Sequence, residues 1–145
     1  MLEYLREDRV SYTMLAHPVQ LLIITNRTGI GPESFGYAGP QWQFTNPIDP
    51  SEDDIAFYNK TGFYFRNEEY YLRPEVLESN FYAYRVTGDA KYLIRAEQAL
   101  DSFVKYVMIR PIYGPAALED VNNSTTPYRL DESESFWYAE TLKYL

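Results

Sequence analysis

The chain of 145 residues contains no cysteine and a single histidine. Without cysteine it has no disulfide framework and no thiolate ligand for a metal. The lone histidine, His17, has no companions for a zinc site or a catalytic triad, so we assign it no role. The apolar run Val19–Ile24 is too short to span a bilayer, which takes about 20 residues. Residues 1–8 are acidic where a signal peptide is basic, and they predict no targeting segment.

Positive charge is also scarce, because 13 Lys and Arg stand against 21 Asp and Glu, for a net charge of −8. This balance argues against nucleic acid as a partner and fits a neutral sugar or a calcium ion. Apolar residues make up 46% of the chain and charged residues 23%, which is typical of a globular domain with a core. The 15 tyrosines suit flat sugar faces, but helix packing is the commoner use of such residues.

Four Asn-x-Ser/Thr acceptors occur, at Asn26, Asn59, Asn122 and Asn123. This density favours a location in the lumen of the secretory pathway, in the endoplasmic reticulum or Golgi, or secretion from the cell.

Turn and cap signals divide the first half of the chain. Helical signals run to about Ala16, and residues 31–51 form a long loop rich in glycine, proline and aromatic residues. Residues 55–71 alternate in polarity around Lys60-Thr61-Gly62, a pattern that predicts a β-hairpin.

Helical hairpins dominate the second half. One helix begins at Pro74 and is closed by Gly88, and Asp89 caps the next, whose broad apolar face extends to Val107. Residues 109–129 form a second loop, after which Asp131 or Ser133 caps a final helix that continues through residue 145. Repeated hairpins of this kind stack side by side, so the sequence predicts an all-α, partial α/α toroid with an inserted β-hairpin.

The segment around the first of these helix starts carries the chemistry. Pro74 opens the helix without losing a hydrogen bond, and Glu75 and Glu78 then lie side by side one turn apart. Such crowded carboxylates need a cation, a metal or a proton, which indicates a site. A solvated helix start, with acids favoured by the helix dipole, explains the same spacing and is the preferred interpretation on spacing alone.

Four blocks support a resemblance to a known family. They are Gly31-Pro32-Glu33, Leu72-Arg73-Pro74-Glu75 with Glu78-Ser79, Arg85-Val86-Thr87-Gly88-Asp89 with Tyr92, and Glu134-Ser135-Phe136 with Glu140-Thr141-Leu142-Lys143-Tyr144-Leu145. In these blocks the chain resembles class I α-1,2-mannosidases, glycoside hydrolase family 47, best over residues 71–145. The resemblance implies an (α/α)7 barrel and a calcium-dependent, inverting removal of α-1,2-linked mannose from oligomannose N-glycans. Residues 1–145 would then be an incomplete catalytic domain, the C-terminal part of that barrel.

The resemblance also implies roles for single residues. Glu75 matches the general base that activates the attacking water, and Arg73 matches a residue that contacts the substrate. An inverting glycosidase needs an acid and a base roughly 6.5–9.5 Å apart with a water between them. The remaining matched positions would line the pocket: Glu33, Glu78, Glu140 and Phe136. The glutamates would touch the terminal mannose or, together with Glu75, waters on calcium. The phenylalanine would stack beneath the sugar.

Each of these positions has a plain structural alternative. Glu33 lies in a loop where exposure is common, Glu78 suits a helix dipole, and Glu140 is spaced to pair with Lys143. Phe136 stands in an aromatic run that is more often core than sugar platform. Without the family resemblance, these alternatives are preferred.

The chain also departs from the family pattern. The first thirty residues offer no counterpart of the catalytic acid, and the threonine that ligates calcium in family members follows the point matched by Leu145. Glu132-Ser133 adds negative charge where the family has a Lys-Met-like pair. We therefore expect the chain alone to be inactive, with no direct calcium ligand. The alternative functions are a lectin-like module that binds mannose glycans without hydrolysis and a truncated product with no function of its own.

Overall fold

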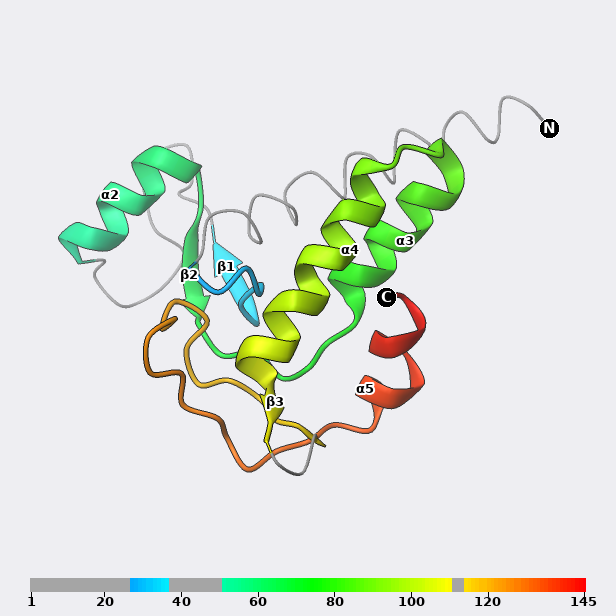
Figure 1. Cartoon of the computed structure of the whole chain (residues 1–145). Coiled ribbons are helices and arrows are strands. Elements are labelled where there is room, and N and C mark those ends of the chain that lie inside the picture. Colours follow the sequence, from blue (N-terminus) through cyan, green and yellow to red (C-terminus); the bar gives the residue numbers. More distant parts are fainter. Residues whose placement is uncertain (1–26, 37–50, 111–113) are drawn as a thin grey trace.

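The computed structural model describes residues 27–36, 51–110 and 114–145. The helix predicted before Ala16, His17 and most of the first loop lie outside these residues. Figure 1 shows a pair of long helices with a smaller group of elements beside it. The elements in chain order are β1 (Ser34–Gly36), α2 (Glu52–Thr61), β2 (Tyr64–Asn67), α3 (Glu75–Thr87), α4 (Lys91–Ser102), a π-helical turn (Phe103–Val107), β3 (Met108–Ile109), β4 (Gly114–Pro115), α5 (Phe136–Ala139) and a 3₁₀ turn (Thr141–Lys143).

The hairpin of α3 and α4 confirms the prediction for the middle of the chain. Gly88 ends α3 at φ 68°, a left-handed conformation that glycine adopts without strain, and its N–H donates to the Tyr84 carbonyl at 2.8 Å. The Asp89 carboxylate then accepts the Lys91 N–H at 3.0 Å, close to the expected cap, although the helix itself begins after Ala90. The two helices lie side by side in Figure 1.

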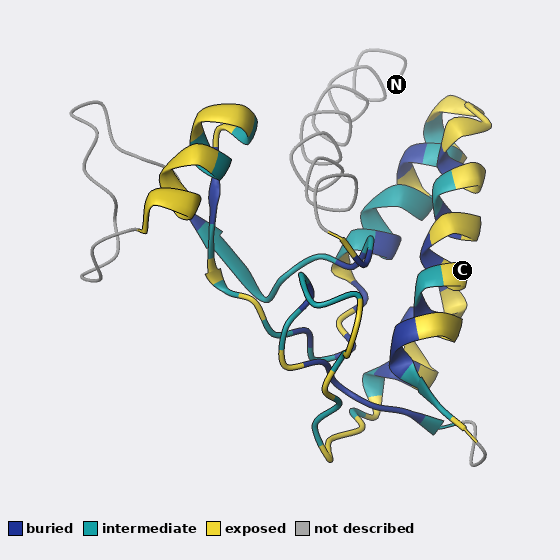
Figure 2. Cartoon of the chain, turned by 60° about the vertical axis from the view of Figure 1, so that its left-hand side comes forward, coloured by how far each residue is buried: buried dark blue, intermediate teal, exposed yellow. Residues whose placement is uncertain are grey.

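Only part of the broad apolar face predicted for the second helix is buried. Tyr92, Ala96 and Ala99 of α4 face inward, whereas Leu93 and Leu100 are exposed. Figure 2 shows this division, with buried positions between the helices and exposed ones on their outer sides. The π-helical turn that extends α4 adds Phe103, Tyr106 and Val107 to the buried side.

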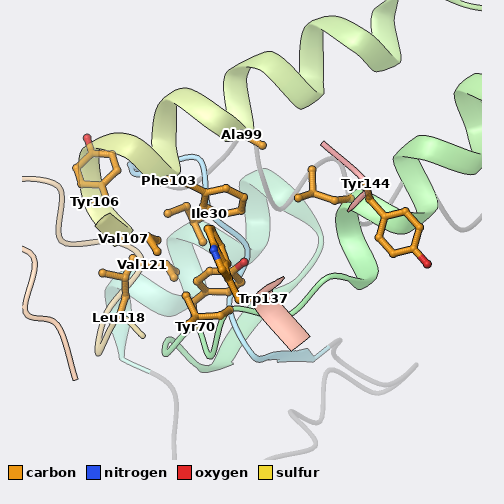
Figure 3. Close-up of a cluster of buried hydrophobic side chains, with 12 residues drawn as sticks. Ile30, Tyr70, Ala99, Phe103, Tyr106, Val107, Leu118, Val121, Trp137 and Tyr144 are labelled. Carbon is orange, nitrogen blue, oxygen red and sulfur yellow. The ribbon is translucent and has the colours of Figure 1, made fainter. Parts of the chain in front are cut away.

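The main core lies below the helical hairpin and joins segments that are far apart in sequence (Figure 3). The Tyr70 and Phe103 rings stack in parallel with their centroids 5.9 Å apart, and Phe103 meets Trp137 edge to face at 5.0 Å. These three rings connect the segment before α3, the end of α4 and α5. The buried members of the cluster are Ile30, Tyr70, Leu72, Leu77, Ala99, Phe103, Tyr106, Val107, Leu118, Val121, Trp137 and Tyr144.

The predicted β-hairpin over residues 55–71 is wrong in its first arm. Residues 52–61 form α2, because Ser51 and Asp54 make a capping box in which the Ser51 Oγ accepts the Asp54 N–H at 3.1 Å. Gly62, expected in a hairpin turn, instead ends α2 at φ 82°. The second arm is a strand, β2, but it pairs antiparallel with β1 from the preceding loop.

The loop predicted after residue 109 is confirmed as largely irregular, but it is well anchored. β3 and β4 form a short antiparallel pair, and Leu118 is completely buried. The Leu118 and Tyr70 backbones exchange two hydrogen bonds of 2.9 and 3.0 Å, which tie this loop to the segment before α3.

The single long helix predicted for the C-terminal segment is wrong. Helix α5 has four residues, with Ser135 rather than Asp131 or Ser133 before it, and the backbone breaks at Glu140 (φ −131°, ψ −55°). The 3₁₀ turn that follows places Thr141 in the core, where its hydroxyl donates to the Leu72 carbonyl at 2.9 Å. This tertiary contact overrides the local helical preference of the sequence.

The described residues are mostly helical, as predicted, and they contain one long helical hairpin with a short helix beside it. Closure of such hairpins into a toroid stays a prediction. No helix in the described part of the chain has the length and apolar character needed to cross a membrane.

Candidate functional site

The turn that leads into α3 contains a strained residue. Leu72 has φ 63° and is completely buried. For a residue with a side chain this left-handed conformation costs roughly 1–2 kcal/mol, so it persists only where the surroundings impose it. Strain of this kind at a buried turn, directly before Arg73 and Glu75, marks the turn as a candidate site.

Glu33 is the first brace of this turn. One carboxylate oxygen accepts the Tyr71 N–H at 2.7 Å, and the other accepts the Nε–H of Arg73. The Glu33 side chain is 11% exposed and that of Arg73 is 51% exposed. The Glu33 N–H itself donates to the Glu69 carbonyl at 2.7 Å. Glu33 therefore holds the turn from a segment forty residues away, and the simple exposed-loop interpretation of this residue is wrong.

We expect Glu33→Ala to lower the free energy of unfolding by about 1–3 kcal/mol, because it leaves the Tyr71 N–H without its carboxylate partner. Urea denaturation followed by circular dichroism measures the change. Glu97→Ala, at an exposed position of α4, is the matched control and should change stability by less than about 0.5 kcal/mol. Equal stability of the two variants would show that Glu33 does not brace the turn.

The opposite side of the turn is held by Tyr70 and Thr141. The Tyr70 hydroxyl donates to the Arg73 carbonyl at 3.2 Å, and the Thr141 hydroxyl donates to that of Leu72 at 2.9 Å. Burial raises the pKa of Tyr70 strongly, and the negative charges of Glu33 and Glu75 raise it further.

Glu75, the predicted general base, is exposed at the first position of α3. Arg73 lies beside it, and the pKa of Arg73 is raised by its hydrogen bond to Glu33 and by the charges of Glu33 and Glu75. The Arg73 guanidinium also lies 6.0 Å from the centroid of the Phe136 ring, in cation–π geometry. The structure thus brings together four predicted site residues at the start of α3: Glu33, Arg73, Glu75 and Phe136.

Glu78 and Glu140 belong to a second group, formed around Tyr144. The Tyr144 hydroxyl donates to a Glu78 carboxylate oxygen at 3.1 Å, and Glu78 is half-buried. Glu140 is exposed, and its charge contributes to the raised pKa of Tyr144. The pocket roles of all the site glutamates stay predictions. The geometry adds that Glu78 is tied to the C-terminal segment.

The tyrosine–glutamate pair predicts a loss of stability at high pH. Burial, followed by the hydrogen bond to Glu78, raises the pKa of Tyr144 to about 12. Above pH 10 the unfolded chain therefore releases this proton before the folded chain does, and the free energy of unfolding falls as the pH rises from about 10 to 12. Urea denaturation at several pH values measures the slope. Tyr144→Phe should flatten it relative to an exposed control, Tyr128→Phe, and equal slopes would contradict the assignment.

Sequence reasoning missed three residues of this site: Tyr70, Thr141 and Tyr144. Thr141 and Tyr144 belong to a block that was recognised, but nothing in their spacing pointed to the partners that they find in the fold. The available signal was that Thr141 and Tyr144 follow Trp137 by four and seven residues, a helical spacing that places all three on one face.

Among residues 27–36, 51–110 and 114–145, no three His, Asp or Glu side chains are placed to hold a metal ion. Glu33 already bonds a backbone N–H and a guanidinium, and Glu78 accepts from a tyrosine. The absence of a direct calcium ligand in this chain stays a prediction.

The comparisons with known proteins agree on one family. The model of glycosyl hydrolase family 47 matches residues 14–145, well beyond the blocks recognised in the sequence. The chain is 44% identical over 117 residues to a probable mannosyl-oligosaccharide α-1,2-mannosidase 1B of Neosartorya fischeri, and 42% identical over 117 residues to the mannosyl-oligosaccharide α-1,2-mannosidase 1B of Emericella nidulans. Each match covers 81% of this chain, which spans only 22% and 21% of those relatives.

The fold agrees as well. The structure of an α-1,2-mannosidase from Trichoderma reesei superposes with a TM-score of 0.77 at 35% sequence identity, covering 90% of this chain and 26% of that one. The sequence match, which covers most of the chain, and the structural superposition lead to the same conclusion. The chain belongs to glycosyl hydrolase family 47.

Proposed function

We propose that this chain supplies the general base and part of the sugar-binding surface of an α-1,2-mannosidase that trims oligomannose N-glycans. The observation that supports the proposal is the braced turn, where Glu33 bonds Arg73 and the Arg73 guanidinium lies 6.0 Å from the centroid of the Phe136 ring. Glu75 follows directly, at the first position of α3. The relatives named above are mannosyl-oligosaccharide α-1,2-mannosidases, which supports the same chemistry.

Each residue has a task that its position supports. Glu75 is exposed and thus reaches the attacking water. Its carboxylate removes a proton from this water as the water attacks the anomeric carbon. The sugar contacts are assigned to the Phe136 ring, which is partly buried against the core, and to the Arg73 guanidinium over it, which donates hydrogen bonds to hydroxyl groups. Bound in this way, the terminal mannose is oriented for attack from the side of Glu75.

The catalytic acid of an inverting pair lies across the sugar from the base, and no described residue is identified with it. We therefore place this acid in the remainder of a complete family domain. The chain on its own is expected to bind oligomannose weakly and to release no mannose.

A transplant tests the proposal. Residues 14–145 replace the matching region of the Neosartorya fischeri relative, and free mannose released from an oligomannose glycan is measured, with the anomeric configuration of the product followed by NMR. Hydrolysis with inversion supports the proposal. A folded chimera that binds the glycan saturably but releases no mannose would favour the lectin-like alternative, and one that neither binds nor cleaves would reject both.

No step of this proposal is assigned to calcium. Contact of Glu75, Glu78 and Glu140 with calcium through water stays a prediction for a complete domain.

A location in the lumen of the secretory pathway is part of the proposal, and the sequons support it. Asn59 is exposed in the last turn of α2, and Asn122 and Asn123 lie partly buried in the second loop, whereas Asn26 is outside the described residues. Glycopeptide mapping of the chain expressed in a fungal host tests the location, and Asn59 is the acceptor that we expect to be modified.

A further inference from the structure

We propose that Thr141 is a positioning residue, whose buried hydroxyl holds the Leu72 carbonyl and so keeps the strained turn in the conformation that directs Arg73 and Glu75. This inference rests on the proposed function for its consequence in sugar binding. Its structural part, the link between Thr141 and the conformation of Leu72, stands independently.

The first step is that Leu72 needs to be held. Its left-handed conformation is disfavoured for a residue with a Cβ, and relaxation to negative φ would re-orient the neighbouring peptide groups. Glu33 holds the N–H of Tyr71 before Leu72, and Thr141 holds the C=O of Leu72 itself. The two contacts fix the backbone on both sides of the strained residue.

The second step is that this hydrogen bond is costly to lose. Thr141 and Leu72 are both completely buried, and water does not reach the Leu72 carbonyl to replace a missing donor. A buried acceptor deprived of its partner carries the full cost of its desolvation. The turn would then relax toward an arrangement in which that carbonyl reaches another donor or solvent.

The third step is the backbone break at Glu140. A continuous helix through this segment would satisfy its own backbone groups, yet the chain leaves helical geometry at Glu140 and resumes in a 3₁₀ turn. From this turn Thr141 bonds the residue before Arg73, and Tyr144 bonds Glu78 on the first turn of α3. One short segment thus contacts the chain on both sides of Glu75, at Leu72 before α3 and at Glu78 within it.

The fourth step connects Leu72 to the functional side chains. Pro74 has a restricted φ, observed at −87°, and a residue before proline, here Arg73, is confined largely to extended conformations. Little torsional freedom is left between Leu72 and Glu75. A change in the Leu72 backbone is therefore passed on to the directions of Arg73 and Glu75.

The test compares three variants of the full chain. Thr141→Val removes the hydroxyl and keeps the shape, whereas Thr141→Ser keeps the hydroxyl. Thr28→Val is the matched control, because Thr28 is also a buried threonine whose hydroxyl donates to a distant carbonyl, that of Val121. The readouts are the backbone chemical shifts of Leu72 and Arg73 and the affinity for α-1,2-mannobiose, both measured by NMR.

We expect Thr141→Val to move the Leu72 shifts away from left-handed values and to weaken mannobiose binding about tenfold. Thr141→Ser should restore both, and Thr28→Val should leave both unchanged even where it lowers stability. Unaltered Leu72 shifts in folded Thr141→Val would overturn the inference, as would a Ser variant that behaves like the Val variant. If the unmodified chain binds no mannobiose, the proposed function is in question, while the Leu72 shifts still decide the role of Thr141.

Discussion

Replacement of Glu75 by glutamine is expected to lower kcat for mannose release by about 10²- to 10⁴-fold in the chimera that carries residues 14–145. Glutamine keeps the shape of the side chain and one acceptor oxygen, but its amide does not take a proton from the attacking water. Glu75 is exposed at the start of α3, so the substitution should not disturb the core. The decisive measurement is steady-state mannose release together with urea denaturation of the same samples.

Glu97→Gln provides the matched control, because Glu97 is exposed on α4, away from the braced turn, and should keep full activity. KM should change little in Glu75→Gln, since the sugar is still held by Arg73 and Phe136. Full activity of the Glu75 variant would place the base elsewhere. Loss of activity together with loss of folding would instead give Glu75 a structural role.

The sequence predicts the central hairpin well because its signals are local. Pro74 opens α3 and Gly88 closes it, and both act through their own backbone preferences without help from distant residues. The same method fails for residues 55–61, where alternating polarity suggested a strand but the chain is part of α2. The capping box of Ser51 and Asp54 was the stronger local signal for a helix.

The strained turn shows what local signals do not contain. Nothing in the sequence around Leu72 indicates a left-handed residue, since this conformation depends on Glu33, thirty-nine residues earlier, and on Thr141, sixty-nine residues later. The helix predicted through residue 145 fails for the same reason, because Thr141 leaves helical geometry to reach a partner that only the fold brings near.

Most residues of the candidate site were also predictable, whereas the contacts between them were not. These residues were identified through family resemblance, because paired glutamates on a helix start have a plain structural explanation. The pairings themselves, Glu33 with Arg73 and Glu78 with Tyr144, became visible only in the folded chain. In this site the residues that brace the turn are as informative as those expected to touch the sugar.

The largest effect on stability is expected for Trp137→Ala, at about 3–5 kcal/mol. Trp137 is 3% exposed and packs edge to face on Phe103, so its removal leaves a cavity where α5 meets the end of α4. Because a domain of this size is typically stable by only about 5–15 kcal/mol, such a loss would leave the chain close to unfolding at room temperature.

Urea denaturation of Trp137→Ala and of a control, Tyr138→Ala, measures this effect. Tyr138 is the next residue on α5 but is 61% exposed, so its removal should change stability by less than about 0.5 kcal/mol. The same helix leads into Thr141, so we also expect the Leu72 shifts to change in Trp137→Ala and not in Tyr138→Ala. Equal stability of the two variants would mean that α5 is not anchored in the core, and the brace on Leu72 would then have no support from that side.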